Sequence, residues 1–347
     1  MGRFRIGELK PKYPLVQGGM AVGISLDNLA AAVANAGGIG VIGTAGIGFF
    51  SKIKNYRQAS IIELKNVIRR AREKSKGIIG VNIMVALTNF ADMVRTSIEE
   101  GVDVIFSGAG LPLNLPSFLK ENSKTKLVPI ISSVRAAKLV VKRWFSKYEY
   151  LPDALVLEGP LAGGHLGYKK EEIFSEDRSL ERNIPVVKEY LISLEKEYGK
   201  KIPLIAGGGL YSREDVQRVL KLGADAVQMG TRFIATEECD ANPEFKMAII
   251  KAKNEDVTII KSPVGLPGRA IRNSFVVAVE RGEKKPFTCR YHCIKTCDFR
   301  KTPYCIAEAL YNAAIGKVEN GVVFTGGAVS KVNKIQRVKD IFEELFE

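Results

Sequence analysis

The stretch Asp153–Gly167, D-A-L-V-L-E-G-P-L-A-G-G-H-L-G, joins a predicted strand to a glycine-rich loop. An apolar run, Ala154–Leu157, ends at Glu158, and glycines then flank His165, one of two histidines in the chain. Histidine is the side chain best suited to moving a proton near neutral pH. Flanking glycines let a backbone or a flat ligand approach closely. The alternative is a loop in which His165 has only a structural role, and the rest of the chain decides between the two.

The alternation of strand and helix recurs along the 347 residues. Short apolar runs lie at Leu15–Val16, Ile39–Ile42, Ile78–Met84, Val102–Phe106, Leu127–Ile131, Ala154–Leu157, Ile202–Ala206 and Ala224–Met229. Amphipathic segments between them lie at Ile61–Arg72, Asp92–Glu100, Val134–Trp144 and Glu181–Glu197. Two helix starts carry capping signals, Ser25 before Asp27 and Ser212 with Asp215. Eight strand–helix units that close on themselves predict an α/β protein with a (β/α)8 TIM barrel rather than an open sheet.

In such a barrel the functional face lies at the carboxyl ends of the strands. The predicted strands end in small residues and amides, including Gln17-Gly18-Gly19-Met20, Ser107-Gly108-Ala109-Gly110, Glu158-Gly159, Ala206-Gly207-Gly208-Gly209 and Gln228-Met229-Gly230-Thr231, and the third strand carries Asn82. A flat aromatic ligand lying against backbone requires a rim of this kind. The loops after strands seven and eight often hold a phosphate through backbone N–H groups. Gly207–Gly209 and Gly230–Thr231 therefore predict phosphate binding, with tight strand-to-helix turns as the alternative.

As an ordered set, these motifs resemble the nitronate monooxygenase (2-nitropropane dioxygenase) family, which includes the FMN-dependent enoyl-acyl-carrier-protein reductase II branch. The matching stretches run from residue 14 to 233: P-L-V-Q-G-G-M, A-A-A-V-A-N-A-G-G-I-G-V-I-G, G-V-N-I-M, S-G-A-G, E-G-P-L-A-G-G-H-L-G, I-A-G-G-G and V-Q-M-G-T-R-F. Looser similarity continues to G-R-A-I-R-N at Gly268–Asn273. The resemblance implies an FMN-binding barrel with a smaller inserted lid domain.

The resemblance also implies roles for individual residues. His165 matches the family's active-site histidine, which would act as a base or orient the substrate. Glycines and amides would lie against the flavin ring or ribityl chain, and the glycines after strands seven and eight would hold the phosphate. The expected cofactor-binding residues are Gln17, Gly19, Met20, Asn82, Glu158, Gly163, Gly164, Gly207, Gly208, Gly209, Gln228, Gly230 and Thr231.

Two activities are compatible with this resemblance. The first is FMN-dependent oxidation of alkyl nitronates by oxygen, with His165 as the active-site base. The second is NAD(P)H-dependent reduction of an enoyl thioester, favoured slightly by G-V-N-I-M, S-G-A-G and a basic surface suited to an acidic carrier protein. The partner would then be a small-molecule nitronate or acyl thioester, joined by acyl carrier protein or an electron-transfer protein. A non-enzymatic flavin or iron–sulfur sensor is a third class.

The composition and the distribution of charge limit which other classes of partner are expected. The formal net charge is +14 and the pI is about 9.4, but Lys and Arg are interspersed with acids and no nucleic-acid-binding pattern occurs. We therefore expect no nucleic-acid partner. The chain has no apolar run near 18 residues and no signal-peptide pattern at its start, which predicts a cytoplasmic protein without membrane association. Five glutamines among many charged residues hint at a thermophilic source, and a homodimer is compatible with the sequence.

Four of the five cysteines fall within one short stretch, C-R-Y-H-C-I-K-T-C-D-F-R-K-T-P-Y-C. They are Cys289, Cys293, Cys297 and Cys305. Clustered cysteines in a cytosolic chain more often bind metal than form disulfides. The spacing C-x3-C-x3-C-x7-C lacks the paired C-x2-C knuckles of zinc ribbons, whereas iron–sulfur sites are more varied. The four cysteines predict an iron–sulfur cluster, with zinc, disulfides or free thiols as alternatives. Cys239 is not expected to be a ligand, and His292 is expected at the surface.

For the domain organisation we expect three parts. Residues 1–236 would form the FMN-binding TIM barrel, residues 237–317 an inserted lid domain with the cysteine cluster, and residues 318–347 a C-terminal return to the barrel. A separate C-terminal cap is the alternative. Within these parts, Pro243–Lys253 and Val329–Phe346 are predicted to be helical, and Ser262–Gly268 is predicted to be a turn-rich connector.

Overall fold

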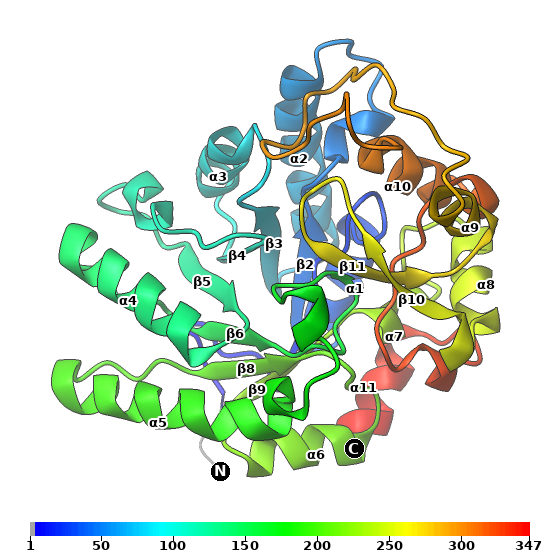
Figure 1. Cartoon of the computed structure of the whole chain (residues 1–347). Coiled ribbons are helices and arrows are strands. Elements are labelled where there is room, and N and C mark those ends of the chain that lie inside the picture. Colours follow the sequence, from blue (N-terminus) through cyan, green and yellow to red (C-terminus); the bar gives the residue numbers. More distant parts are fainter. Residues whose placement is uncertain (1–3) are drawn as a thin grey trace.

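The computed structural model describes residues 4–347. A closed barrel of parallel strands, in the order β1-β2-β3-β4-β5-β6-β8-β9, lies at its centre and helices surround it (Figure 1). The strands are β1 (Leu15–Gln17), β2 (Ile39–Gly43), β3 (Ile78–Met84), β4 (Val104–Gly108), β5 (Lys126–Ile131), β6 (Leu155–Glu158), β8 (Leu204–Gly207) and β9 (Ala226–Met229). The barrel closes where Val16 of β1 pairs with Gln228 of β9. The predicted TIM barrel is confirmed, and its strands lie where the apolar runs predicted them.

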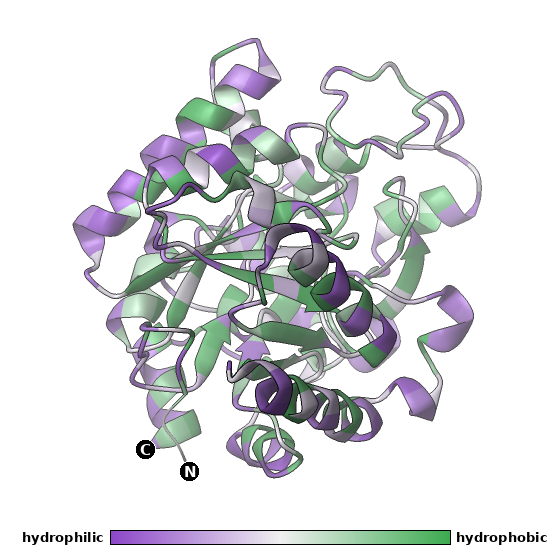
Figure 2. Ribbon diagram, turned by 90° about the vertical axis from the view of Figure 1, so that its left-hand side faces the viewer, coloured by the Kyte–Doolittle hydropathy of each residue, from purple (hydrophilic) through white to green (hydrophobic). Residues whose placement is uncertain are grey.

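Burial on both faces explains why the strands read as continuous apolar runs. Val41, Phe106, Val156 and Ile205 belong to one buried cluster contributed by several strands. Figure 2 shows the same division, with apolar strands at the centre and polar residues mainly on the outward sides of the helices. The helices of the barrel layer are α1 (Asp27–Asn35), α2 (Tyr56–Lys74), α3 (Phe90–Glu99), α4 (Val134–Tyr148), α5 (Leu180–Tyr198), α6 (Arg213–Lys221), α7 (Thr231–Ile234) and α11 (Val338–Phe346).

The two predicted helix caps have different outcomes. At α6 the capping box is confirmed, because the Asp215 N–H donates to Ser212 Oγ at 3.3 Å and the Ser212 N–H donates to Asp215 Oδ2 at 3.1 Å. At α1 the prediction is wrong. The Ser25 hydroxyl accepts from the Met20 N–H at 2.8 Å instead of capping the helix.

The carboxylate of Asp240 takes the place of the expected cap on α1. It accepts from the Leu26 N–H at 2.7 Å and from the N–H groups of Asn28 and Leu29 at 3.2 Å each. A carboxylate suits this position because the first turn of a helix has unpaired N–H groups and a partial positive charge. The segment after the barrel is therefore fastened to the first helix.

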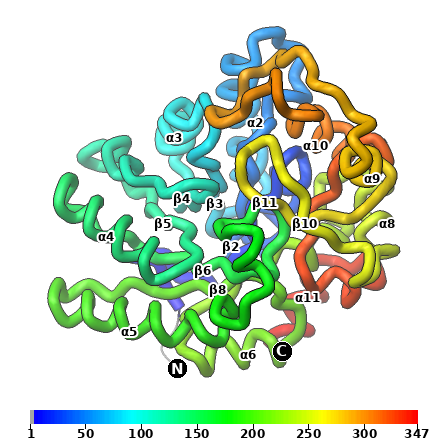
Figure 3. The backbone as a smooth tube through the Cα atoms, viewed as in Figure 1, coloured from blue at the N-terminus to red at the C-terminus, as the bar shows by residue number. Residues whose placement is uncertain are grey.

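A second, antiparallel sheet covers one side of the barrel mouth. It has the order β10-β11-β7 and consists of β7 (Gly164–His165), β10 (Val257–Lys261) and β11 (Pro267–Ile271). His165 pairs with Gly268, so the loop after β6 and the later segment share this sheet. Figure 3 shows the segment with β10 and β11, in yellow, beside the green loop after β6. The remaining helices are α8 (Pro243–Lys251), α9 (Ser274–Glu280) and α10 (Ile306–Ala314).

Two of the later predictions can be compared with the structure directly. The Ser262–Gly268 connector contains a tight turn, in which the Gly265 N–H donates to the Ser262 carbonyl at 2.9 Å. The predicted helix over Val329–Phe346 is interrupted, because Gln336 forms a bridge with Thr236 and its N–H donates to the Ala235 carbonyl at 3.1 Å. Helix α11 begins only at Val338. None of the described helices is long and apolar enough to cross a membrane.

Candidate active site

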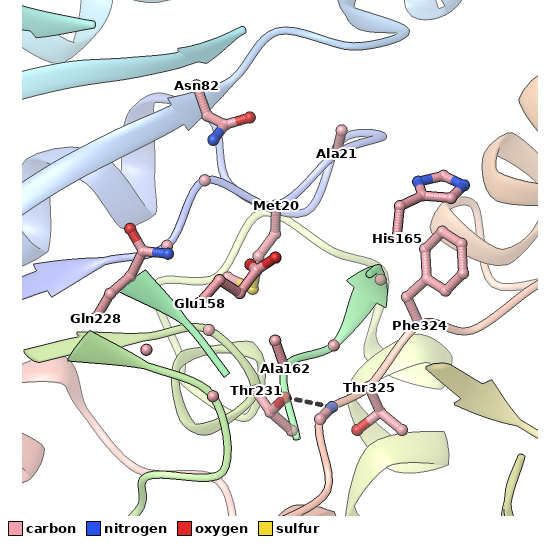
Figure 4. Close-up of a pocket in the computed structure, with 18 of the residues that line it drawn as sticks. Met20, Ala21, Asn82, Glu158, Ala162, His165, Gln228, Thr231, Phe324 and Thr325 are labelled. Carbon is pink, nitrogen blue, oxygen red and sulfur yellow. Dashed lines mark hydrogen bonds between the residues drawn. The ribbon is translucent and has the colours of Figure 1, made fainter. Parts of the chain in front are cut away.

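A pocket lies over the carboxyl ends of the barrel strands (Figure 4). It gathers the predicted histidine and nearly all the predicted cofactor-binding residues. Those that line it are Gly19, Met20, Asn82, Glu158, Gly163, Gly164, His165, Gly207, Gly208, Gly209, Gln228, Gly230 and Thr231. Because these residues come from several strands and loops, the closing of the barrel brings them together.

Gln17 is the exception. Its side chain is fully buried and lies outside the pocket lining. Its Oε1 atom accepts from the Val41 N–H at 2.9 Å, and its Nε2 atom donates to the Gly18 carbonyl at 2.5 Å. The amide therefore links β1 to β2, and the structure does not support the predicted contact with a ligand.

Several glycines of the pocket have conformations or contacts that a larger residue would not tolerate. Gly208 has a φ of +111°, and a Cβ atom there would lie 3.0 Å from the Ala162 nitrogen and 3.0 Å from the Gly159 oxygen. Gly164 also has a positive φ, +75°, but a Cβ atom there would meet only Phe324, at 4.0 Å. Close-packed backbone thus forms part of the pocket wall, which suits a flat ligand.

Residues 324–326, near the C-terminus, close one end of the pocket. The Gly326 N–H donates to Thr231 Oγ1 at 2.8 Å, which joins the start of α7 to the segment around Gly326 (Figure 4). Thr325, next to it, lines the pocket, and its Oγ1 atom is buried without a hydrogen-bond partner among residues 4–347. An unpaired buried hydroxyl is costly unless a ligand or water satisfies it. Phe324 and Thr325 were not predicted as pocket residues, although both lie within the predicted C-terminal return, residues 318–347.

His165 stands at the wall of this pocket. Its Nε2 atom lies 2.7 Å from Ser262 Oγ, and its ring meets Phe324 edge to face, with ring centroids 4.9 Å apart. Burial lowers the pKa of His165 to about 4, so the imidazole is uncharged at neutral pH. Ser262 was not predicted, because it lies 97 positions away in the sequence and only the pairing of β7 with β11 brings it to His165.

Glu158 ends β6 and also lines the pocket. Burial raises the pKa of its carboxyl group to about 7, because the charged form loses its hydration. The backbone carbonyl of Glu158 accepts from the Tyr168 hydroxyl at 2.6 Å, which fixes the strand end. The side chain can therefore hold a proton near neutral pH.

A second pocket adjoins the first at His165 and Glu158, which line both. Its other walls include Ser132, the exposed Lys169 and Lys170, and residues 265–267 at the end of the turn between β10 and β11 and the start of β11. Lys169 and Lys170 bring positive charge to a wall that also carries the carboxylate of Glu172. A ligand in the first pocket and a substrate in the second would therefore meet beside His165 and Glu158.

The four clustered cysteines lie elsewhere, in the segment before α10. All are unpaired, which sets aside disulfides in this structure. Across residues 4–347, no group of three or more His, Cys, Asp or Glu side chains is arranged to hold a metal ion. The predicted iron–sulfur cluster therefore stays a prediction. Cys239 is buried in the barrel core, where its thiol donates to the Ile24 carbonyl at 3.2 Å.

The fold is a TIM barrel, and a pocket lined in part by a histidine lies at the carboxyl ends of its strands. The chain belongs to the nitronate monooxygenase family, whose model matches residues 4–347. The family consists of FMN-dependent oxidoreductases of the nitronate monooxygenase or enoyl reductase type, and the protein is an oxidoreductase of this kind.

Three similar proteins illustrate the range of the family. A probable nitronate monooxygenase of Staphylococcus saprophyticus is 27% identical over 299 residues, which cover 78% of each chain. A carboxyl-CoA dehydrogenase of Mycobacterium tuberculosis is 27% identical over 275 residues, covering 79% of this chain and 67% of the relative. The structure of FabK from Thermotoga maritima is 28% identical with a TM-score of 0.72, covering 96% of this chain and 92% of that chain.

Proposed function

We propose that the first pocket binds FMN. The support is the fit of the residues present: a wall of close-packed glycine backbone, two glycine loops after β8 and β9, and the unpartnered hydroxyl of Thr325. Gly208, Gly209, Gly230 and Thr231 would hold the phosphate, and Gly164 would lie against the flavin ring. When bound, FMN supplies the acceptor and donor of electrons that the amino acids lack.

We propose nitronate oxidation as the reaction that this geometry supports best. The observation that carries it is an uncharged His165, held by Ser262, on the wall shared by the two pockets. A nitronate is already an anion, so its oxidation requires no proton abstraction from carbon. A pKa of about 4 makes His165 a weak base but leaves its imidazole neutral and able to hydrogen-bond. His165 thus orients the anion, and Lys169 and Lys170 favour its entry.

Reduction of an enoyl thioester is the second candidate, and Glu158 is the observation that favours it. Saturating a carbon–carbon double bond requires a hydride and a proton. A carboxyl group whose pKa is raised to about 7 carries a proton near neutral pH and lies on both pockets. The carboxyl-CoA dehydrogenase and FabK among the similar proteins agree with this alternative. NAD(P)H would then be the electron source.

An anaerobic half-reaction separates the two. FMN-loaded protein is mixed without oxygen with an alkyl nitronate, or with NADH or NADPH, and bleaching of the flavin absorbance is followed. Nitronate oxidation predicts rapid bleaching by the nitronate and slow bleaching by the nicotinamides. Rapid bleaching by a nicotinamide, reversed by an enoyl thioester, would instead identify an enoyl reductase and contradict nitronate oxidation.

A further inference from the structure

Arg269 is a buried arginine in β11, behind the wall of the first pocket. Only 5% of its surface is exposed. Its Nε atom donates to the Ala162 carbonyl at 3.1 Å, and its Nη2 atom donates to the Pro160 carbonyl at 2.5 Å. Its backbone pairs with Gly164 of β7, and its carbonyl accepts from the Thr325 N–H at 3.2 Å. Arg269 therefore joins two segments of the pocket wall, and Ala162 and Thr325 from these segments lie at the same end of the pocket (Figure 4).

Residues 159–163 connect β6 to β7 and are here called the β6–β7 loop. Three successive carbonyl groups of this loop are occupied by hydrogen bonds. Arg269 holds the first and the third of them, and the Gly327 N–H donates to the second, that of Leu161, at 2.9 Å. The loop is thus held along its length by one side chain and by the last part of the chain.

The occupied carbonyls decide where the N–H groups of the β6–β7 loop point. The loop contains no cis peptide bond, and in a planar trans peptide the C=O and the N–H that follows it point in opposite directions. The N–H groups of Leu161 and Gly163 are therefore directed away from the guanidinium, and neither donates to a backbone carbonyl among residues 4–347. Both residues line the pocket. On its free side the loop offers hydrogen-bond donors rather than acceptors.

The β6–β7 loop packs against both parts of the wall where we place the phosphate of FMN. A Cβ atom at Gly209, in the glycine loop after β8, would lie 2.9 Å from the Leu161 Cβ atom. A Cβ atom at Gly163 would lie 2.8 Å from the nitrogen of Gly326, whose N–H donates to Thr231. Backbone N–H groups bind anions, whereas carbonyl oxygens repel them. The direction of the peptides in this loop therefore matters to a phosphate.

Arg269 also brings a positive charge to this loop. Its hydrogen bonds among residues 4–347 go to two neutral carbonyls and to no carboxylate. Burial lowers the pKa of the guanidinium, but arginine titrates so far above neutral pH that the group stays charged. Arg232, which is also buried, differs because its guanidinium pairs with the carboxylate of Glu344. A buried charge without an acidic partner is costly, and an anion bound nearby offsets that cost.

We propose that Arg269 is a positioning residue of the flavin site, which turns the N–H groups of the β6–β7 loop toward the ligand and makes the site favour a ligand that carries a phosphate. The inference rests on the FMN binding proposed above and does not depend on which substrate reacts. Riboflavin, which is FMN without its phosphate, gains from the shape of the loop but not from the charge. The preference for FMN over riboflavin therefore measures the effect of the charge.

The test is the Kd of FMN and of riboflavin for the flavin-free, full-length protein, measured by flavin fluorescence for wild type, Arg269→Lys and Arg269→Gln. Lysine and glutamine can each hold one of the two carbonyls, so both variants should bind both flavins more weakly. Only Arg269→Gln also loses the charge. We expect the preference for FMN to stay at the wild-type value in Arg269→Lys and to fall by about 10-fold in Arg269→Gln, the size of one unit charge acting through protein.

Arg272→Gln is the matched control. It removes a positive charge three residues further along the chain, from an exposed side chain whose Nη2 atom lies 2.8 Å from a Glu280 carboxylate oxygen. This variant should keep both Kd values of the wild type. Circular dichroism checks that each variant is folded.

The outcomes separate this inference from the FMN site itself. Wild-type protein that binds FMN, together with an unchanged preference for FMN in Arg269→Gln, would overturn the role of Arg269 and leave the FMN site intact. A preference lost in Arg269→Lys would also overturn it, and this result does not require Arg269→Gln to fold. Wild-type protein that binds neither flavin would contradict the FMN site, and the inference with it.

Discussion

The Nε2 atom of His165 lies 2.7 Å from the hydroxyl oxygen of Ser262. His165 belongs to the loop after β6, and Ser262 belongs to the turn between β10 and β11. The pairing of His165 with Gly268 fixes the register between these two parts of the chain. His165, in the pocket wall, is thus held by a segment that follows the barrel strands in the sequence, and Ser262 is its hydrogen-bond partner.

Removing that hydroxyl should slow turnover without loss of flavin. We expect Ser262→Ala to lower kcat by about 10-fold, the size of one hydrogen bond, and His165→Ala, which removes the group that orients the anion, to lower it by about 100-fold. Ser262→Thr keeps a hydroxyl and should restore most of the activity. The exposed Ser146 provides the control, Ser146→Ala. If Ser262→Ala keeps the wild-type kcat while His165→Ala is slow, the hydrogen bond between His165 and Ser262 does not contribute to turnover.

Glu158 should make stability depend on pH. Its pKa is raised to about 7 in the folded protein from an ordinary value of 4.5. Between these values the folded state keeps a proton that the unfolded state has lost, so the free energy of unfolding falls as pH rises through this window. Glu158→Gln removes the effect. Urea unfolding of flavin-free protein at pH 5 and pH 7.5 should therefore show a smaller difference for this variant than for wild type.

The matched control for Glu158 is Glu171→Gln, a change at an exposed carboxylate in the next loop. It should keep the pH dependence of the wild type. If the unfolding free energy changes equally with pH in wild type and in Glu158→Gln, the Glu158 carboxyl group is not protonated near neutral pH.

Thr325 tests whether the pocket is built around a ligand. Its Oγ1 atom is buried and has no protein partner among the described residues, so Thr325→Val should leave the flavin-free protein as stable as wild type or slightly more stable. If the hydroxyl bonds to FMN, the same change should raise the Kd for FMN by about 10-fold. Titration of flavin-free protein with FMN, followed by flavin fluorescence, measures this.

Thr236→Val is the contrasting change for Thr325. Thr236 is also buried, but its hydroxyl already donates to the Phe233 carbonyl at 2.8 Å. This variant should lose stability and keep its affinity for FMN. If Thr236→Val weakens FMN binding and Thr325→Val does not, the ligand does not contact the Thr325 hydroxyl.

Asp240 should prove important for stability rather than for catalysis. Its carboxylate accepts from three N–H groups at the start of α1, and an amide offers a single neutral oxygen in its place. Asp240→Asn should cost about 1 kcal/mol of unfolding free energy, the usual value of a helix cap. Chemical denaturation measures it, with the exposed Asp177→Asn as control. Equal losses in both variants would refute the capping role.

These positions also show what a sequence can predict. The barrel strands were predictable because buried parallel strands are apolar on both faces, so each run marks its own position. Glycine-rich strand ends were predictable for a similar reason, since Gly208 and its neighbours need conformations or contacts that other residues do not tolerate. Both signals are local. They identified the fold and most of the pocket lining.

Partners that are distant in sequence were not predictable in this way. Ser262 and Asp240 act on His165 and on α1 through contacts that exist only in the folded chain. The ligand contact that the resemblance implies for Gln17 stays a prediction, because an amide at a strand end has the same sequence whether it faces the pocket or, as here, bonds to the neighbouring strand. Thr325 could not be recognised from the sequence, because only the structure shows that its hydroxyl is buried without a partner among residues 4–347.

We propose that the pocket over the strand ends is an FMN site. The most direct test is to release the cofactor from protein reconstituted with a mixture of FMN and FAD, and to identify and count it by chromatography and mass spectrometry. We expect one FMN per chain and no FAD, because the glycine loops after β8 and β9 end at the closure formed by Thr231 and Gly326. FAD in place of FMN, or no bound flavin at all, would contradict it.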